Sequence, residues 1–160
     1  MGEKSTAKHS YWLMKSEPDC YSIDDLKQKK RDMWDGTRNY QVRNMMRDEM
    51  RIGDKVLFYH SSTKNVGVVG EMKIVKEAYP DPTQFDPNSD HPDPKSDPDN
   101  PRWFCVDVQF VKKYPRVVSL AEMREVNELH DMRLLQKGNR LSVMPISKKH
   151  FESIATLAEQ

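Results

Sequence analysis

The chain has 160 residues and a formal net charge of +1, with 26 Lys or Arg residues set against 25 Asp or Glu residues. A chain of this length typically folds as one domain with its own core. No apolar run approaches the roughly 18 residues that cross a bilayer, and the first ten residues lack the apolar stretch of a secretory signal. These features argue against a membrane-spanning or secreted protein, and we expect a soluble intracellular protein with no membrane partner.

The N-terminal region differs from the rest of the chain. Residues 1–9 are polar and are expected to form a flexible tail ahead of a single domain over residues 10–160. The two cysteines, Cys20 and Cys105, allow at most one disulfide, which favours a disulfide-free intracellular protein. Neither cysteine has the surroundings of a nucleophile.

The first predicted elements are a strand and two helices. Residues 11–14 form a short apolar strand, and Pro18 ends it because proline cannot extend a strand ladder. Ser22 with Asp25 three residues later is an N-cap signature that opens a helix over residues 23–30. A second helix begins near Asn39 and has a helical apolar face that contains Val42, Met45, Met46 and Met50.

Strands dominate the next part of the chain. We expect them at residues 55–60, 66–78, 103–112 and 141–144, because β-branched and aromatic residues recur there. Pro145 is expected to close the last strand. Helices are predicted after the N-cap residues Ser119 and Ser147, and residues 129–135 are a candidate for one more helix.

The acidic loop, residues 79–101, stands out by composition. It holds six Asp, one Lys and seven of the ten prolines, so we expect a long surface loop without regular structure. Asp86, Asn88 and Asp90 begin like a calcium loop, but His91 stands where the sharp turn requires Gly, and we therefore expect no metal. The rest of the chain carries a charge of +6, because the loop accounts for −5 of the total of +1. A basic body of this kind attracts polyanions.

Four polar motifs interrupt the apolar patterns at strand ends and helix starts. They are Leu13-Met14-Lys15-Ser16-Glu17-Pro18, Trp34-Asp35-Gly36-Thr37-Arg38-Asn39 with Arg43-Asn44, Phe58-Tyr59-His60-Ser61-Ser62, and Arg140-Leu141-Ser142-Val143-Met144-Pro145. Together, over residues 11 to about 158, they resemble the EVE domain of the thymocyte nuclear protein family and its bacterial relatives. The resemblance implies an α+β fold, a small PUA-like β-barrel of five or six strands flanked by helices, related to the YTH domain and reading modified bases in nucleic acid.

A protein that inspects one base must remove it from the stack, hold its face on aromatic rings and satisfy its polar edge. Trp34 resembles the tryptophan that forms one wall of the base cage in the YTH fold. Glu17 could accept a hydrogen bond from an exocyclic amine, and Lys15 could balance its charge. The predicted base pocket consists of Trp34, Lys15, Ser16, Glu17, Tyr59, His60, Ser61 and Ser142.

A second group of residues is predicted to contact phosphate or base. Two Arg-Asn pairs lie at a helix N-terminus, where free backbone donors favour anions, and a further arginine enters the last strand. Asn39 also fits a purely structural role as the helix cap. The predicted contacts are Arg38, Asn39, Arg43, Asn44 and Arg140.

These features favour a non-catalytic module that binds DNA or RNA and accommodates a modified base, such as a methylated or hydroxymethylated cytosine. We expect no cofactor and a monomer. It would be cytoplasmic in a bacterium or nuclear in a eukaryote.

Two other functions stay open. Some PUA-like amidohydrolases cleave acylated pyrimidine nucleosides, and Lys15 with Glu17 supplies residue types that such an enzyme uses. An adaptor acting through the acidic loop would instead be insensitive to changes in the pocket.

Overall fold

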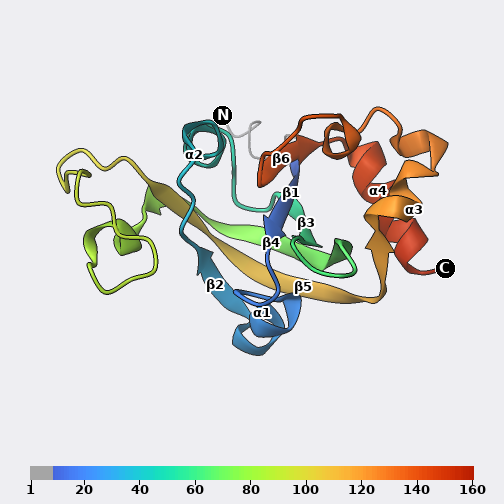
Figure 1. Cartoon of the computed structure of the whole chain (residues 1–160), viewed down its shortest axis with the longest axis horizontal. Coiled ribbons are helices and arrows are strands. Elements are labelled where there is room, and N and C mark those ends of the chain that lie inside the picture. Colours follow the sequence, from blue (N-terminus) through green and yellow to red (C-terminus); the bar gives the residue numbers. More distant parts are fainter. Residues whose placement is uncertain (1–8) are drawn as a thin grey trace.

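The computed structural model describes residues 9–160. The tail predicted for residues 1–9 lies, apart from His9, outside the described residues. The described part contains six strands and four α-helices (Figure 1). In chain order they are β1 (Tyr11–Ser16), α1 (Ile23–Lys29), β2 (Arg31–Trp34), α2 (Tyr40–Asp48), β3 (Lys55–His60), β4 (Gly67–Pro80), β5 (Phe104–Ser119), α3 (Leu120–Arg124), β6 (Val143–Ile146) and α4 (Lys148–Ala158). None of the helices in residues 9–160 has the length and apolar character needed to span a bilayer.

The strands form one mixed sheet in the order β2-β5-β4-β3-β1-β6. β1 and β3 are parallel, and the other neighbours are antiparallel. The register between β4 and β5 shifts at four places, and irregularities of this kind bend a sheet. The α+β class and the six strands agree with the prediction, but the two edges, β2 and β6, do not pair, so the sheet is curved and not closed.

Helices cover both faces of the sheet. On β1, Trp12 and Met14 belong to the buried cluster under α1 and α2, whereas Leu13 between them belongs to the cluster under α3 and α4. This is the period-two alternation of a strand that is buried on both faces. Burial of each such side chain contributes about 1.5–3 kcal/mol. Figure 1 shows α3 and α4 together at the end of the molecule opposite the acidic loop.

The predicted helix starts are confirmed by hydrogen bonds at their N-caps. Ser22 Oγ accepts from the Asp25 N–H at 3.1 Å and completes a capping box at α1. Asn39 Oδ1 accepts from the Val42 N–H at 3.0 Å at the start of α2. Ser119 and Ser147 cap α3 and α4 in the same way. Each cap satisfies a backbone donor that the helix leaves free.

The structure differs from the sequence predictions at several elements. β5 continues seven residues beyond the strand predicted at residues 103–112. Residues 129–135 contain no α-helix. The chain instead forms two 3-10 turns, η3 (Asn127–Leu129) and η4 (Arg133–Leu135), and each turn buries one leucine, Leu129 or Leu134. Pro145 does not end the last strand, since it lies inside β6 opposite Trp12, and an edge strand tolerates the missing donor. The short strand β2 was not predicted, because none of its four residues is fully buried and it lacks a strand-like apolar pattern.

The acidic loop is more regular than predicted. β4 extends to Pro80, which pairs with Phe104, and Asp81 then caps a 3-10 turn, η2 (Pro82–Phe85). Gln84, within the loop, is buried, and its Nε2 donates to the carbonyls of Asp81 and Trp103. Proline favours the first position of a helical turn, because its missing donor is not needed there. The loop therefore folds around internal hydrogen bonds.

Candidate functional site

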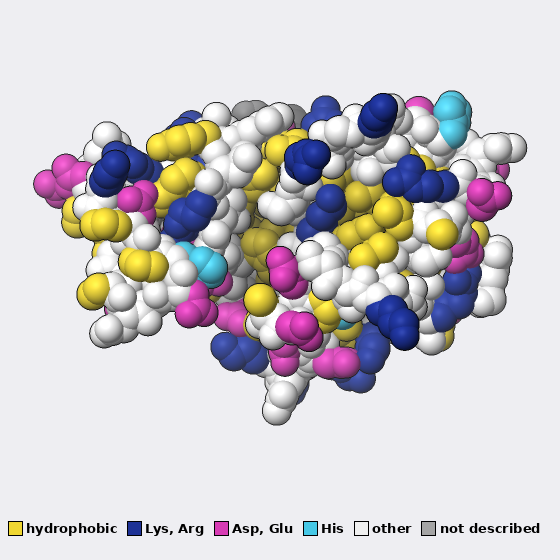
Figure 2. Space-filling view, in the orientation of Figure 1, with side chains coloured by type: hydrophobic (Ala, Val, Ile, Leu, Met, Phe, Trp, Pro, Cys, Tyr) yellow, Lys and Arg dark blue, Asp and Glu magenta, His cyan; other side chains and the backbone are white. Residues whose placement is uncertain are grey.

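A cavity of about 600 Å³ opens between the C-terminal end of β1, strand β2 and the acidic loop. Figure 2 shows a hollow on this face, with hydrophobic side chains at its floor and charged side chains around its rim. Its volume lies in the range of roughly 300–1,000 Å³ that is typical of small-molecule sites. Segments far apart in the sequence thus meet at one concave surface.

Trp34, at the end of β2, is half-buried and lines the cavity. Its ring meets Phe58 at a centroid distance of 5.4 Å and an interplanar angle of 84°, and Tyr21 at 6.4 Å and 86°. Edge-to-face pairs of this kind contribute about 0.5–1.5 kcal/mol beyond area burial. Two other rings therefore hold the indole in place at the cavity wall.

Two carboxylates lie beside Trp34. Asp32 Oδ2 accepts from the Tyr21 hydroxyl at 2.7 Å and is 3.4 Å from Lys29 Nζ. Asp35 also lines the cavity, and the described side-chain hydrogen bonds include none to its carboxylate from another residue. Burial raises the pKa of Asp35, and the nearby Asp81 adds to this effect. Asp35 is thus a partly desolvated acceptor that a ligand can reach.

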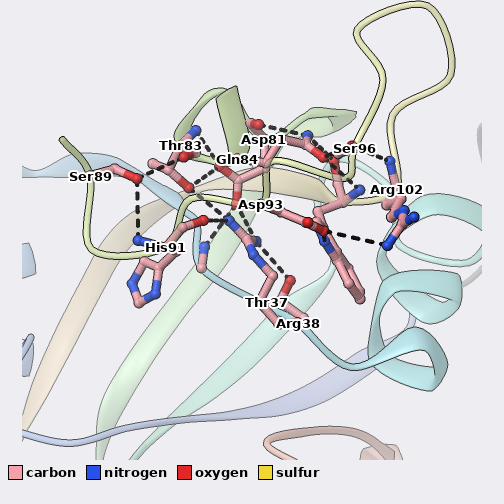
Figure 3. Close-up of polar contacts among 12 residues, drawn as sticks. Thr37, Arg38, Asp81, Thr83, Gln84, Ser89, His91, Asp93, Ser96 and Arg102 are labelled. Carbon is pink, nitrogen blue, oxygen red and sulfur yellow. Dashed lines mark hydrogen bonds and ion pairs between the residues drawn. The ribbon is translucent and has the colours of Figure 1, made fainter. Parts of the chain in front are cut away.

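Arg38 and Asp81 join the segment after Trp34 to the acidic loop (Figure 3). Asp81 Oδ2 accepts from the Gly36 N–H at 2.8 Å and from Arg38 Nη1 at 3.2 Å. Arg38 Nη2 donates to Thr83 Oγ1 at 3.1 Å and to the His91 carbonyl. We call this set of contacts the clamp. It fixes the loop as the outer wall of the cavity.

Asp81 is fully buried, and its ionisation depends on the clamp. Burial alone would raise the pKa of Asp81, but hydrogen bonds from Thr83, Gly36 and Arg38 outweigh it and hold the pKa below the usual value. A buried carboxylate needs such donors, since an unpaired buried charge is strongly destabilising. The clamp is therefore a structural element that is sensitive to the loss of either charge.

Gly36 allows the clamp to close. Its φ of +83° lies in the left-handed region that favours glycine. A Cβ at this position would lie 2.7 Å from the imidazole of His91. The turn after Trp34 thus favours glycine, and a larger residue there would also displace the His91 side chain of the acidic loop.

Four of the predicted base-pocket residues line the cavity: Trp34, Lys15, Ser16 and Ser142. Lys15 is half-buried, and burial lowers its pKa. The Ser16 hydroxyl donates to the Tyr21 carbonyl at 2.6 Å, whereas Ser142 is exposed. The contact of these residues with a base stays a prediction.

The other four predicted base-pocket residues do not line this cavity. β1 ends at Ser16, so strand alternation does not continue to Glu17, which is exposed outside the cavity. Tyr59 is buried in the cluster under α3 and α4, on the other face of the sheet. His60 Nε2 accepts from the Ile23 N–H at 3.1 Å at the start of α1. The Ser61 N–H donates to the Ser16 carbonyl, which extends the pairing of β1 and β3.

The predicted phosphate contacts are divided among three places. Arg38 and Asn39 line the cavity, but Arg38 belongs to the clamp and Asn39 caps α2. The Arg43 guanidinium donates to the Asn44 side chain and to the Arg102 carbonyl, so both residues of this pair are held in a local contact. Arg140 lines a second depression, next to the cavity. The sequence had assigned all five residues the same role, because it could not show which donors are satisfied internally.

Sequence reasoning missed several residues that line the cavity. They are Cys20, Tyr21, Asp32, Met33, Asp35, Thr83, Ser89, Asp90 and His91. The spacing of Asp32 and Trp34 would have placed both on one face if β2 had been recognised. No signal in the sequence indicated that the acidic loop folds over the cavity. Within residues 9–160, no group of three or more His, Cys, Asp or Glu side chains is arranged to hold a metal ion.

Comparisons with known proteins give a consistent result. The EVE domain model matches residues 10–157. Thymocyte nuclear protein 1 from Homo sapiens is 44% identical, over 94% of this chain and 75% of that protein. A crystal structure of human THYN1 in complex with 5-methylcytosine-containing DNA is also 44% identical, with a TM-score of 0.88 over 95% of this chain and 99% of that chain.

A more distant structure shows a related fold. The YTH domain of Mmi1, in a complex with RNA, has a TM-score of 0.56 at 14% identity, over 95% of this chain and 79% of that chain. At this level of identity, the similarity is evidence for the fold alone. The family match covers nearly all of the described residues, and it agrees with the four motifs from which the resemblance was drawn. The chain belongs to the EVE domain family.

Proposed function

We propose that the protein is a nucleic-acid-binding module that takes one modified base into the cavity beside Trp34. A methylated or hydroxymethylated cytosine in DNA is the base class that we favour, because a relative that is 44% identical is described in a complex with 5-methylcytosine-containing DNA. In a eukaryote the protein would act in the nucleus, as the name of its relatives suggests. In a bacterium it would act in the cytoplasm.

The observation that carries the proposal is an indole at the wall of a cavity of about 600 Å³. Trp34 is held edge-on by Tyr21 and Phe58, so little conformational entropy remains to be lost when a base stacks on it. Stacking of a base on an aromatic side chain contributes about 1–3 kcal/mol. The base must leave the helical stack first, and this cost is smaller for a single strand or a mismatch.

Recognition of the polar edge falls to Asp35 in this proposal. The exocyclic amine of cytosine or adenine donates hydrogen bonds, and a carboxylate accepts them. Asp32 is already engaged by Tyr21 and Lys29, whereas Asp35 has no described side-chain partner. Asp35 therefore takes the role that the sequence had assigned to Glu17.

Binding of short oligonucleotides tests the proposal. The set carries cytosine, methylcytosine, hydroxymethylcytosine or methyladenine at one position, in single-stranded and duplex form. The wild type should prefer one modified base, and Trp34→Ala should weaken binding of that oligonucleotide by roughly 5- to 150-fold, the equivalent of about 1–3 kcal/mol. Binding of the unmodified oligonucleotide should change much less.

Tyr40→Ala is the matched control. Tyr40 is an exposed aromatic residue that stacks on Trp103 outside the cavity. Its removal should leave the preference for the modified base intact. A wild type without any preference, or equal losses of preference in both variants, would contradict the proposal.

One observation favours a second function, that of an amidohydrolase. Burial lowers the pKa of Lys15 at the cavity wall, and a less strongly protonated lysine is a better base or nucleophile. However, Glu17, the other residue expected to act, does not line the cavity. Release of product from an acylated cytidine by the wild type, and its loss in Lys15→Ala, would establish this second function.

A further inference from the structure

A second depression, of about 460 Å³, lies next to the cavity. Its charged lining residues are Arg133, Lys137 and Arg140, and no acidic residue of the described range 9–160 lines it. We call it the basic groove. All three cations are exposed, and none of them belongs to an ion pair found among residues 9–160. Figure 2 shows Lys and Arg side chains above the hollow.

The backbone around the basic groove is held by local hydrogen bonds. Asn139 Nδ2 donates to the Arg133 carbonyl at 3.0 Å, and Asn139 Oδ1 accepts from the Leu141 N–H at 3.2 Å. Gly138 turns the chain with a φ of +82°. The segment that carries the three cations is thus fixed at its backbone while their long side chains stay in solvent. Such an arrangement favours contact with a flexible chain of anions.

The basic groove and the cavity are continuous. Asn39 lines both of them, and Arg140 in the groove is two residues from Ser142 in the cavity. A ligand in the cavity that is part of a longer chain therefore has a direct route into the groove. The start of α2 also lies here, and its first turn contains no acidic residue that would repel an anion.

We propose that the basic groove binds the phosphodiester backbone of the strand whose base enters the cavity, through Arg133, Lys137 and Arg140. This inference rests on the proposed function and extends the predicted contact of Arg140 to two residues that the sequence did not indicate. Lys and Arg contacts to phosphate give affinity that falls with salt and is independent of sequence. The cavity would select the base, and the groove would hold the strand.

The double variant Arg133→Gln/Lys137→Gln tests the groove separately from the cavity. Two ligands are compared: the free modified nucleoside, which has no phosphate, and a single-stranded oligonucleotide that carries the same base. The double variant should bind the nucleoside like the wild type and bind the oligonucleotide at least about tenfold more weakly at low salt. The slope of log K against log salt should fall by roughly 1.4, because each phosphate contact with a single strand contributes about 0.7.

Lys64→Gln/Lys73→Gln removes the same charge from exposed positions outside the groove and serves as the control. If Arg133→Gln/Lys137→Gln binds the oligonucleotide as tightly as this control and with the same salt slope, the inference is overturned and the proposed function stands. Failure of the wild type to bind either ligand would instead overturn the proposed function, and the inference with it. Unchanged thermal unfolding of both double variants establishes that they are folded.

Discussion

Two arginines that the sequence placed in one group lie in opposite surroundings. The guanidinium of Arg38 is turned inward to Asp81, Thr83 and the His91 carbonyl. Arg140 is exposed in the basic groove, which no acidic residue in the described part of the chain lines. The first arginine builds the wall of the cavity, and the second keeps its charge available. The number of internal acceptors around an arginine, rather than its place in a motif, decides which of these roles it has.

The largest expected effect is a loss of stability, which should follow a change in the clamp but not a change in the basic groove. Asp81→Ala removes the buried carboxylate, so Arg38 loses its counter-charge and the Gly36 N–H loses its acceptor, and the free energy of unfolding should fall by about 3 kcal/mol. Arg140→Ala should change it by no more than about 0.5 kcal/mol. Chemical denaturation measures both values.

Asp99→Ala is the matched control for the clamp. Asp99 is another aspartate of the acidic loop, exposed and without a described side-chain partner. Equal losses in Asp81→Ala and Asp99→Ala would contradict the structural role of the clamp.

The stabilisation by Asp81 should depend on pH. Folding lowers the pKa of Asp81, so its contribution to stability is present above the pKa of the unfolded state and is lost as the pH falls through the pKa of the folded state.

A smaller effect is expected at Asp35, where stability and binding should change in opposite directions. Burial raises the pKa of Asp35, so its contribution to stability is present below the unfolded pKa and is lost as the pH rises through the folded value. Asp35→Asn should therefore raise the melting temperature at pH 7, and the difference from the wild type should shrink towards pH 4. The same variant should weaken binding of an amine-bearing base.

Thermal unfolding at several pH values and oligonucleotide binding measure the two sides of this prediction. Trp34→Phe provides a control that keeps the charge and retains an aromatic ring at the cavity wall. If Asp35→Asn lowers the melting temperature at pH 7, or leaves the affinity for the oligonucleotide undiminished, Asp35 is not a partly desolvated acceptor that binds the base.

The smallest effect is expected at His60, a predicted pocket residue that is engaged internally like Arg38. Burial lowers the pKa of His60, and its Nε2 must stay unprotonated to accept from the Ile23 N–H. The contribution of His60 to stability is therefore present above the unfolded pKa of about 6.5 and is lost as the pH falls through the folded value.

His60→Gln keeps an acceptor without a titrating group. Its melting temperature should fall less than that of the wild type between pH 7.5 and pH 5, whereas oligonucleotide binding should not change. Parallel pH profiles of the two proteins would contradict the assigned contact.

The local parts of the fold could be predicted from the sequence. Ser22, Asn39 and Ser147 were recognised as N-caps because a cap depends on residues three positions apart. The α+β class followed from the family resemblance, and five of the six strands followed from apolar patterns. β2 was missed because its residues are exposed or only half-buried. The sheet does not close into the expected barrel, because its edge strands β2 and β6 do not pair, and pairing between strands this distant in sequence leaves no local pattern.

The candidate site was predictable only in part, for a related reason. Trp34, Lys15, Ser16 and Ser142 were named from motifs, and they line the cavity. Glu17 was named from the same motif as Lys15 and Ser16, but it does not line the cavity, because β1 ends at Ser16 and the chain turns after it. The contribution of the acidic loop depends on the long-range contacts of the clamp, which include the ion pair between Arg38 and Asp81. No periodic pattern in the sequence marks such contacts.

NMR of the three tryptophan side chains tests the central claim most directly. Their indole N–H signals are followed during titration with an oligonucleotide that carries the preferred modified base. The indole N–H of Trp12 donates a hydrogen bond to the buried Asp54, and that of Trp103 donates to Asp93. Their signals therefore serve as internal references in the same spectrum. The account predicts a large shift of the Trp34 signal that saturates with binding, and little change at Trp12. Binding that leaves the Trp34 signal in place would contradict it.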